Sequence, residues 1–265
     1  MRSMNVRIVW GLAVVVFTSY PFWAAAQPKT QVVMTSARSV DTAISKPVVT
    51  AAEPVSTATE AAGNVNILPL FGEQAKTPEQ IDADIRFLND CDQNFASRAE
   101  ASQFFSARGW DYVSEGQLDT AAYRFNLAYL LSDKNADAFW GLGVVCYQKN
   151  QFRDAVRMLK RGLAVADTNA TLMTDLATVQ IKHYAETKDE DELNEAETLL
   201  QHAVSISPSN ANAYMKLSLV HYTRADYAKA WEHFHRARLF DMSVIDFTYL
   251  NELISKMPDP QKVFR

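Results

Sequence analysis

The fold is decided by the stretch ADAFWGLGVVCYQKNQFRDAVRMLKRGLAVADTN, residues 136–169. Its apolar and small residues recur at helical spacing in two runs, which a short polar turn separates. The same pattern returns at residues 102–135, 170–210 and 211–244, and all of these units except the third have the same length. A period of this size predicts a repeat architecture in which each unit is a pair of helices.

Two columns of small residues indicate how the helices of a unit pack. One column lies on the second helix and the other on the first, and small residues that face each other let two helices approach closely. Larger residues fill the rest of the core, and one unit cannot bury its apolar face alone, so the units must stack. The second-helix column is Ala121, Ala155, Ala196 and Ala230, and the first-helix column is Gly109, Gly143, Ala177 and Ser218. The large residues are Phe105, Phe139, Met173, Tyr214, Phe125, Leu159, Leu200 and Phe234.

These aromatic, small and aliphatic positions resemble the tetratricopeptide repeat (TPR) family, whose unit is two antiparallel helices. The resemblance covers residues 102–244 and implies an all-α fold, a right-handed α-solenoid of about four helix pairs. The chain departs from the family pattern at Arg108, where an aliphatic residue is usual, and only Pro208 is a proline at the end of a unit. The third unit also carries an acidic insertion at residues 186–192, which we interpret as a solvated helix extension and turn. It lacks the central glycine and the ligand order of a calcium loop.

Flanking helices are expected to extend the stack. Thr77 and Gln80 have the spacing of a capping box, so a helix is predicted within residues 77–97. Residues 245–265 are predicted to form a C-terminal capping helix and a tail, because apolar residues of 246–256 fall on one side and two prolines follow.

The N-terminus has the pattern of a secretory signal peptide over residues 1–26. A basic start and an apolar run precede Ala24-Ala25-Ala26 and Gln27. An uncleaved membrane anchor is the alternative. Cleavage predicts a periplasmic or secreted protein that is not inserted in a membrane. Residues 27–76 are predicted to be a disordered linker, in which the apolar segment Ile67–Gly72 could dock on the folded part as an arm.

Export permits a disulfide between Cys91 and Cys146, the only cysteines of the chain. The alternative is that each is a small buried apolar residue. The five histidines do not have metal-ligand spacing, since His233 and His235 point to different faces of a predicted helix.

No nucleophile, phosphate-loop or metal motif is present in the sequence, so we expect neither an enzyme nor a cofactor or metal. The net charge of −5 and the lack of a basic cluster argue against nucleic acid.

The resemblance implies that a protein partner binds in the concave groove, which the first helix of each unit lines. At the places where a carboxylate-clasping groove carries Lys, Asn and Arg, this chain has Ser106, Trp110, Trp140 and Val144, so we expect an apolar aromatic groove instead. The alternative is that its residues pack against the arm or within the interhelical core. The aligned groove positions are Trp110, Val113, Trp140, Val144, Tyr147, Thr174, Thr178, Ile181, Met215, Leu219 and Tyr222.

Two functions therefore remain open at this stage. The first is an exported scaffold or adaptor that binds a protein or peptide through this groove. The second is a structural subunit of an envelope assembly, of the secretion or pilus type, that uses its outer faces.

Overall fold

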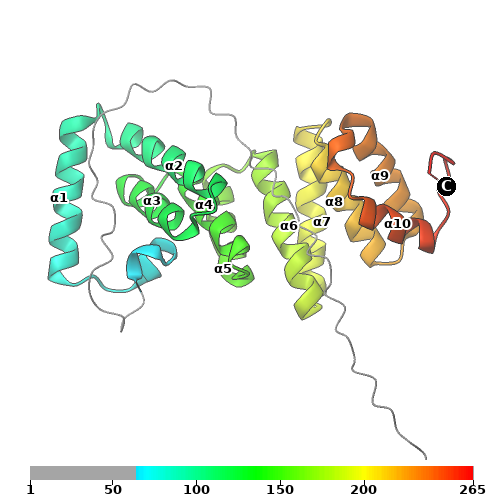
Figure 1. Ribbon diagram of the computed structural model, residues 1–265, viewed down its shortest axis with the longest axis horizontal. Coiled ribbons are helices and arrows are strands. Elements are labelled where there is room, and N and C mark those ends of the chain that lie inside the picture. The colour runs from blue at the N-terminus through cyan, green and yellow to red at the C-terminus, as the bar shows by residue number, and fades with distance from the viewer. Residues whose placement is uncertain (1–63, 265) are drawn as a thin grey trace, which may run out of the picture. The chain divides into compact units, whose positions relative to one another are not determined.

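The structure, a computed structural model, describes residues 64–264, and the predicted signal peptide and the linker up to residue 63 lie outside this range. The described part is all-α and has no strand, which confirms the predicted fold class (Figure 1). No helix in it is long and apolar enough to cross a bilayer. The helices are α1 (Pro78–Asn94), α2 (Arg98–Ser114), α3 (Leu118–Leu131), α4 (Ala136–Gln148), α5 (Phe152–Val165), α6 (Ala170–Thr187), α7 (Glu190–Ile206), α8 (Ala211–Thr223), α9 (Tyr227–Phe240) and α10 (Phe247–Lys256), with short 3-10 helices η1 (Val65–Ile67), η2 (Pro69–Glu73) and η3 (Met242–Val244).

The helices pack as four successive pairs. The closest packing is within the pairs α2–α3, α4–α5, α6–α7 and α8–α9, and the second helix of each pair also packs on the first helix of the next. First helices meet at α2–α4 and α6–α8, whereas α1 and α10 flank the stack on α2 and α9. The first pair begins at Arg98, four residues before the predicted start of its unit.

Local sequence explains where each first helix begins. Asn135, Asn169 and Asn210 are the N-caps of α4, α6 and α8, and each side chain accepts a backbone N–H of the first turn. Two of these asparagines also donate to the preceding first helix. Asn135 bonds the Ser102 hydroxyl at 2.7 Å, and Asn210 bonds the Thr174 hydroxyl at 3.2 Å. The caps therefore fix both the start of a helix and its distance from its neighbour.

The turn inside each pair contains one residue in the left-handed region. These residues are Gly116, Asn150, Lys188 and Ala225, with φ between 59° and 74°. Glycine and asparagine adopt this conformation readily, whereas alanine incurs a steric penalty in it. The third turn comes later because the acidic insertion lengthens α6 to Thr187 and supplies the first turn of α7.

Small residues set the packing within and between the pairs, as expected. The Phe125 ring is fully buried between α2 and α4, where a methyl group on Gly109 or Gly141 would overlap it. In the fourth pair the Ser218 hydroxyl donates to the Ala230 carbonyl at 2.7 Å.

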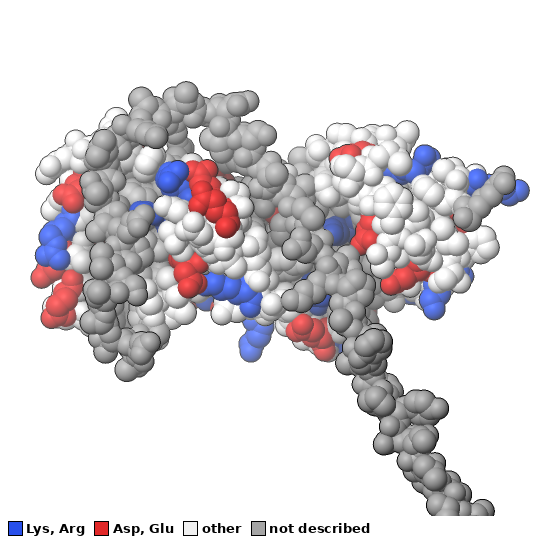
Figure 2. Space-filling view, in the orientation of Figure 1, with Lys and Arg blue, Asp and Glu red and all other residues white. Residues whose placement is uncertain are grey.

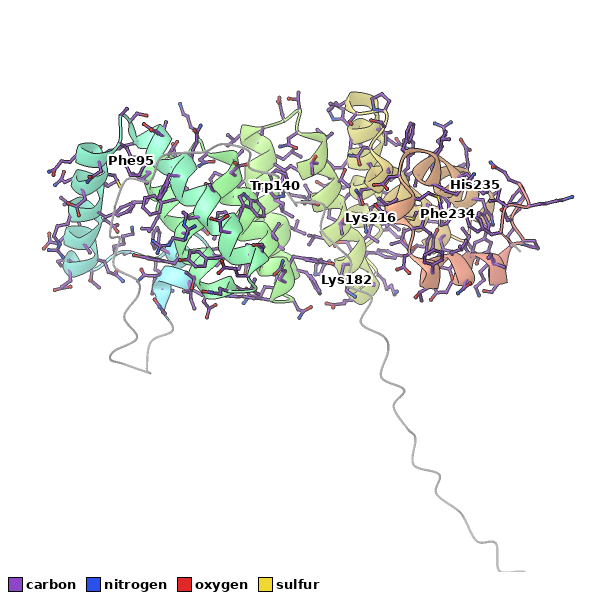
Figure 3. The ribbon with its side chains drawn as sticks, turned by 45° about the horizontal axis from the view of Figure 1, so that its top comes forward. Phe95, Trp140, Lys182, Lys216, Phe234 and His235 are labelled. Atoms are coloured by element: carbon purple, nitrogen blue, oxygen red, sulfur yellow. The ribbon has the colours of Figure 1, made fainter. Side chains whose placement is uncertain are left out.

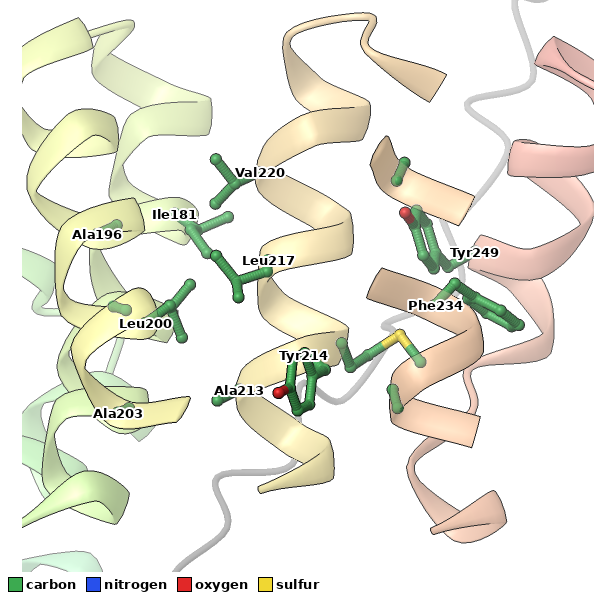
Figure 4. Close-up of a cluster of buried hydrophobic side chains, with 14 of the residues drawn as sticks. Ile181, Ala196, Leu200, Ala203, Ala213, Tyr214, Leu217, Val220, Phe234 and Tyr249 are labelled. Atoms are coloured by element: carbon green, nitrogen blue, oxygen red, sulfur yellow. The ribbon is translucent and has the colours of Figure 1, made fainter. Parts of the chain in front are cut away.

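A shared apolar core joins the third and fourth pairs. Ile181 of α6 lies against Leu217 and Val220 of α8 in a cluster that also receives α7, α9 and α10 (Figure 4). Units that share buried side chains in this way stabilise each other, as a stacked repeat requires.

The chain ends in a closed turn on α9. The Asp259 carboxylate lies 2.7 Å from His235 Nε2 and accepts three backbone N–H groups of residues 261–264. The Phe264 ring stacks on Trp231, whose indole N–H donates to a backbone carbonyl of the tail. The Phe264 ring of the tail therefore packs on Trp231, Phe234 and His235 of α9.

The two cysteines are free and buried. Cys91 lies in the cluster around α1 and α2, whereas Cys146 lies in the cluster between α4 and α6. The disulfide alternative is therefore not what the structure contains, and both residues serve as small apolar core residues.

Candidate protein-binding surface

Every predicted groove residue lies on a first helix, but their side chains differ in exposure. Trp140 is 8% exposed, and the other buried members are Val144, Thr174, Thr178, Ile181 and Met215. The half-buried members are Trp110, Val113, Tyr147, Leu219 and Tyr222. We call this set of half-buried residues the first-helix face. Whether it binds a partner stays a prediction.

Trp140 connects neighbouring units. Its ring meets Trp110 edge to face at 5.6 Å, and Trp110 meets Phe125 in the same way at 5.2 Å. Its indole N–H donates to Asp175 Oδ2 of α6 at 2.8 Å. Because Asp175 is fully buried, this hydrogen bond holds α4 and α6 together from inside the protein. Trp140 therefore has a structural role in addition to any role in binding.

Charged side chains adjoin the predicted groove residues. Lys216 of α8 (Figure 3) interacts electrostatically with Asp175 and Asp246. Burial lowers the pKa of Lys216 to about 8, and the two carboxylates partly oppose that shift. In the sequence, Asp175 directly follows the predicted groove residue Thr174, and Lys216 directly follows Met215. This adjacency could have identified them as charged neighbours of the groove.

Aromatic residues continue at the C-terminal end of the first-helix face. Tyr222 meets Tyr249 of α10 edge to face at 5.4 Å and Tyr227 at 5.7 Å. The Tyr249 hydroxyl lies 2.7 Å from the Ser218 hydroxyl, so its polar end is satisfied inside the core. Tyr222 therefore presents a braced ring, the kind of rigid amphipathic group that forms binding hot spots.

The arm does not lie on the first helices, contrary to the possibility that it fills the groove. Residues 65–73 form η1 and η2 and pack on α3, a second helix, with Leu70 and Phe71 buried. They also differ from the predicted disordered linker. Lys76 lies over the Phe71 ring at 4.1 Å and forms an ion pair with Asp84 of α1. These two contacts connect the arm to α1.

Four of the five histidines lie against a neighbouring side chain. His221 and His233 stack with ring centroids 5.1 Å apart, and His235 pairs with Asp259 as described above. His183 lies 2.8 Å from Glu192. Within residues 64–264 no group of three or more His, Cys, Asp or Glu side chains could hold a metal ion.

Charged side chains on the surface are mixed. Figure 2 shows Lys and Arg interspersed with Asp and Glu on the visible face of the described residues. Many of them pair across helices, such as Lys149 with Asp119 at 2.6 Å and Lys160 with Glu195 at 2.7 Å.

Comparison with solved structures identifies the fold. PilF of Pseudomonas aeruginosa superposes with a TM-score of 0.52 at 22% identity, over 62% of this chain and 74% of its own. TTC0263, a TPR protein of Thermus thermophilus, superposes with a TM-score of 0.51 at 17% identity, over 61% of this chain and 93% of its own. The chain has the fold of a TPR solenoid. No family model and no curated protein sequence matches it.

Proposed function

We propose that this TPR protein is a non-enzymatic scaffold that binds a protein partner through its first-helix face. The observation that carries the proposal is the row of half-buried aromatic and apolar side chains on α2, α4 and α8. Rigid aromatic groups of this kind contribute most to protein interfaces. The signal-peptide pattern of residues 1–26 supports a location in the periplasm or outside the cell.

The exposure of each residue decides how this proposal is tested. Trp140 is a poor probe because its removal would take a buried hydrogen-bond donor away from Asp175 and would destabilise the fold. Tyr147 and Tyr222 are better probes because they are only half-buried. A matched control is the pair Val165 and Ile206, exposed apolar residues at the ends of α5 and α7.

The experiment is in-cell photocrosslinking from position 113, followed by identification of the attached protein. We expect the same partner from position 219, and we expect Tyr147→Ala with Tyr222→Ala to reduce its capture at least tenfold. Val165→Ala with Ile206→Ala should leave capture unchanged. If the tyrosine variant captures the partner normally, the first-helix face is not the site. N-terminal sequencing of the exported protein should begin at Gln27, and an intact N-terminus would contradict cleavage.

A second candidate is a structural subunit of an envelope assembly, and one observation favours it. The last residue of α5, α7 and α9 is in each case exposed and apolar, namely Val165 at 43%, Ile206 at 40% and Phe240 at 45%. Such a row suits an interface along the ends of the second helices. Changing all three to Glu should then release the protein from a large assembly in gentle extracts, whereas elution of the unaltered protein as a monomer would contradict this function.

A further inference from the structure

The arm, residues 65–73, is held by a site whose polar groups lie on second helices. We define the arm site as Asn126 of α3, Arg157 and Arg161 of α5, and the apolar cluster of α3, α4 and α5 residues that receives Leu70. Phe125 and Met158 belong to that cluster, so the Leu70 side chain joins the core of the first two units.

Asn126 recognises the backbone of the arm. Its Oδ1 accepts the Leu70 N–H at 2.9 Å, and its Nδ2 donates to the carbonyls of Asn66 at 2.7 Å and Leu68 at 2.8 Å. Asn126 is fully buried, and all three of these bonds go to main-chain atoms. A side chain that bonds only main-chain groups places a peptide without reading its sequence, so selectivity must come from elsewhere in the site.

Two features of the site select side chains. The first is the apolar cluster that buries Leu70, and Phe71 beside it is also buried, with Lys76 over its ring. The second is the arginine pair, because Glu73 forms ion pairs with both Arg157 and Arg161. The site therefore accepts two adjacent bulky apolar residues, with a carboxylate two residues after the second of them.

The arm fits this site under strain. Leu70, Phe71 and Glu73 have φ of 53°, 56° and 53°, a left-handed conformation that is unfavourable for residues with a Cβ atom. Three such residues lie within four positions, so the arm would not adopt this turn by itself. Its ion pairs with the arginines are also partly exposed and therefore weak. The arm is a tethered ligand that fits imperfectly.

We propose that the arm site is a second peptide-binding site, filled in cis by the arm and available to a partner peptide of the same chemistry. That partner segment carries two adjacent bulky apolar side chains followed by a carboxylate, and it displaces the arm because the strain and the weak ion pairs of the arm leave the arm loosely held. The polar groups of the site lie on the second helices α3 and α5, whereas its apolar cluster also includes α4 residues and packs against Trp110 and Val113. The arginines are not part of the first-helix face, so a test through them is separate from binding at that face.

The test uses a fluorescent synthetic peptide of residues 64–76 and the full-length chain. Leu70→Ala with Phe71→Ala removes the side chains that hold the arm and vacates the site. We expect fluorescence anisotropy to show that the peptide binds this vacated chain at least ten times more tightly than the unaltered chain, in which the arm competes. A peptide with both apolar residues changed to Ala should not bind.

The arginine pair provides a variant that keeps the core intact. In the vacated chain, Arg157→Gln with Arg161→Gln should weaken peptide binding at least fivefold. A peptide with Glu73→Gln should bind the vacated chain equally well with and without these arginine changes, because it has no carboxylate for the arginines to pair with. Lys160→Gln is the matched control on the same helix, because Lys160 pairs with Glu195 instead. If the vacated chain keeps its helical circular dichroism and does not bind the peptide, or if Lys160→Gln weakens binding as much as the arginine changes, the proposal is wrong.

Discussion

The close packing of the Phe125 ring against Gly141 predicts that adding a methyl group at Gly141 destabilises the fold. A methyl group built on Gly141 would lie 2.1 Å from two atoms of the Phe125 ring and 2.4 Å from a third. The ring has no room to move toward α2, because it already packs so closely on Gly109 that a methyl group added there would lie 2.7 Å from it. Phe125 is fully buried, so no nearby solvent can receive it. Gly141→Ala must therefore displace the ring or separate α3 from α4.

The expected size follows from two opposing effects. Overpacking of a core costs about 1–3 kcal/mol, and replacing a helical glycine with alanine returns about 1 kcal/mol. Because 2.1 Å is far shorter than any stable carbon–carbon contact, the upper part of that range applies and the net loss is about 2 kcal/mol. Gly162 on α5 is the matched control, since its nearest neighbours would be 3.4 Å from a new methyl. Gly162→Ala should stabilise the fold by about 0.5 kcal/mol.

Urea unfolding followed by far-ultraviolet circular dichroism measures this difference. We expect Gly141→Ala to unfold at lower urea than the unaltered protein and Gly162→Ala at equal or higher urea. Phe125→Leu should cost less in the Gly141→Ala background than alone, because the smaller side chain makes room for the methyl group. Equal midpoints for the two glycine variants would refute the view that Phe125 is wedged between α2 and α4.

Three further predictions concern titration, turns and thiols. Burial lowers the pKa of His233 to about 4 and also lowers that of His221, so stability should fall by about 2 kcal/mol between pH 6.5 and pH 4. Unfolding at several pH values, with His233→Gln flattening the profile, checks this. Ala225→Gly should raise the free energy of unfolding by about 0.5–1 kcal/mol, since φ at 225 is 59°; a decrease in the same urea assay would contradict it. Burial raises the pKa of Cys91 to about 11 and of Cys146 to about 12, so iodoacetamide should label them only after unfolding, and rapid labelling of the folded chain would count against their burial.

The fold could be predicted because its determinants are local and periodic. The small residues of the two columns to which Ala155 and Gly143 belong recur at a nearly fixed period. Small residues that face each other are what two closely packed helices require. The position of the arm could not be predicted in this way. It depends on Asn126, a single polar residue in the apolar run of α3, and on arginines more than eighty residues from Glu73. The one indication in the sequence was Asn126, a polar residue at a position of the predicted helix that is otherwise apolar.

The groove illustrates a different limit. The family pattern identifies which helix carries a position, and the structure places all of these positions on first helices. It does not determine how far a large side chain reaches. The Trp140 side chain reaches α6 and donates a hydrogen bond to Asp175, so this predicted groove residue links two units from inside the protein. Residue size and a buried partner thus decide between binding and packing, and neither follows from the repeat period.

The closed turn around Asp259 makes the fourth unit depend on residues outside the repeat. The Asp259 carboxylate accepts backbone N–H groups of the tail and lies against His235 of α9, and Phe264 stacks on Trp231 of the same helix. A chain cut after Val244 would lose these contacts together with α10 and would expose Trp231, which is now buried. The stability of the fourth unit is therefore not a property of the repeat alone, and a transplanted unit needs this tail to fold as it does here.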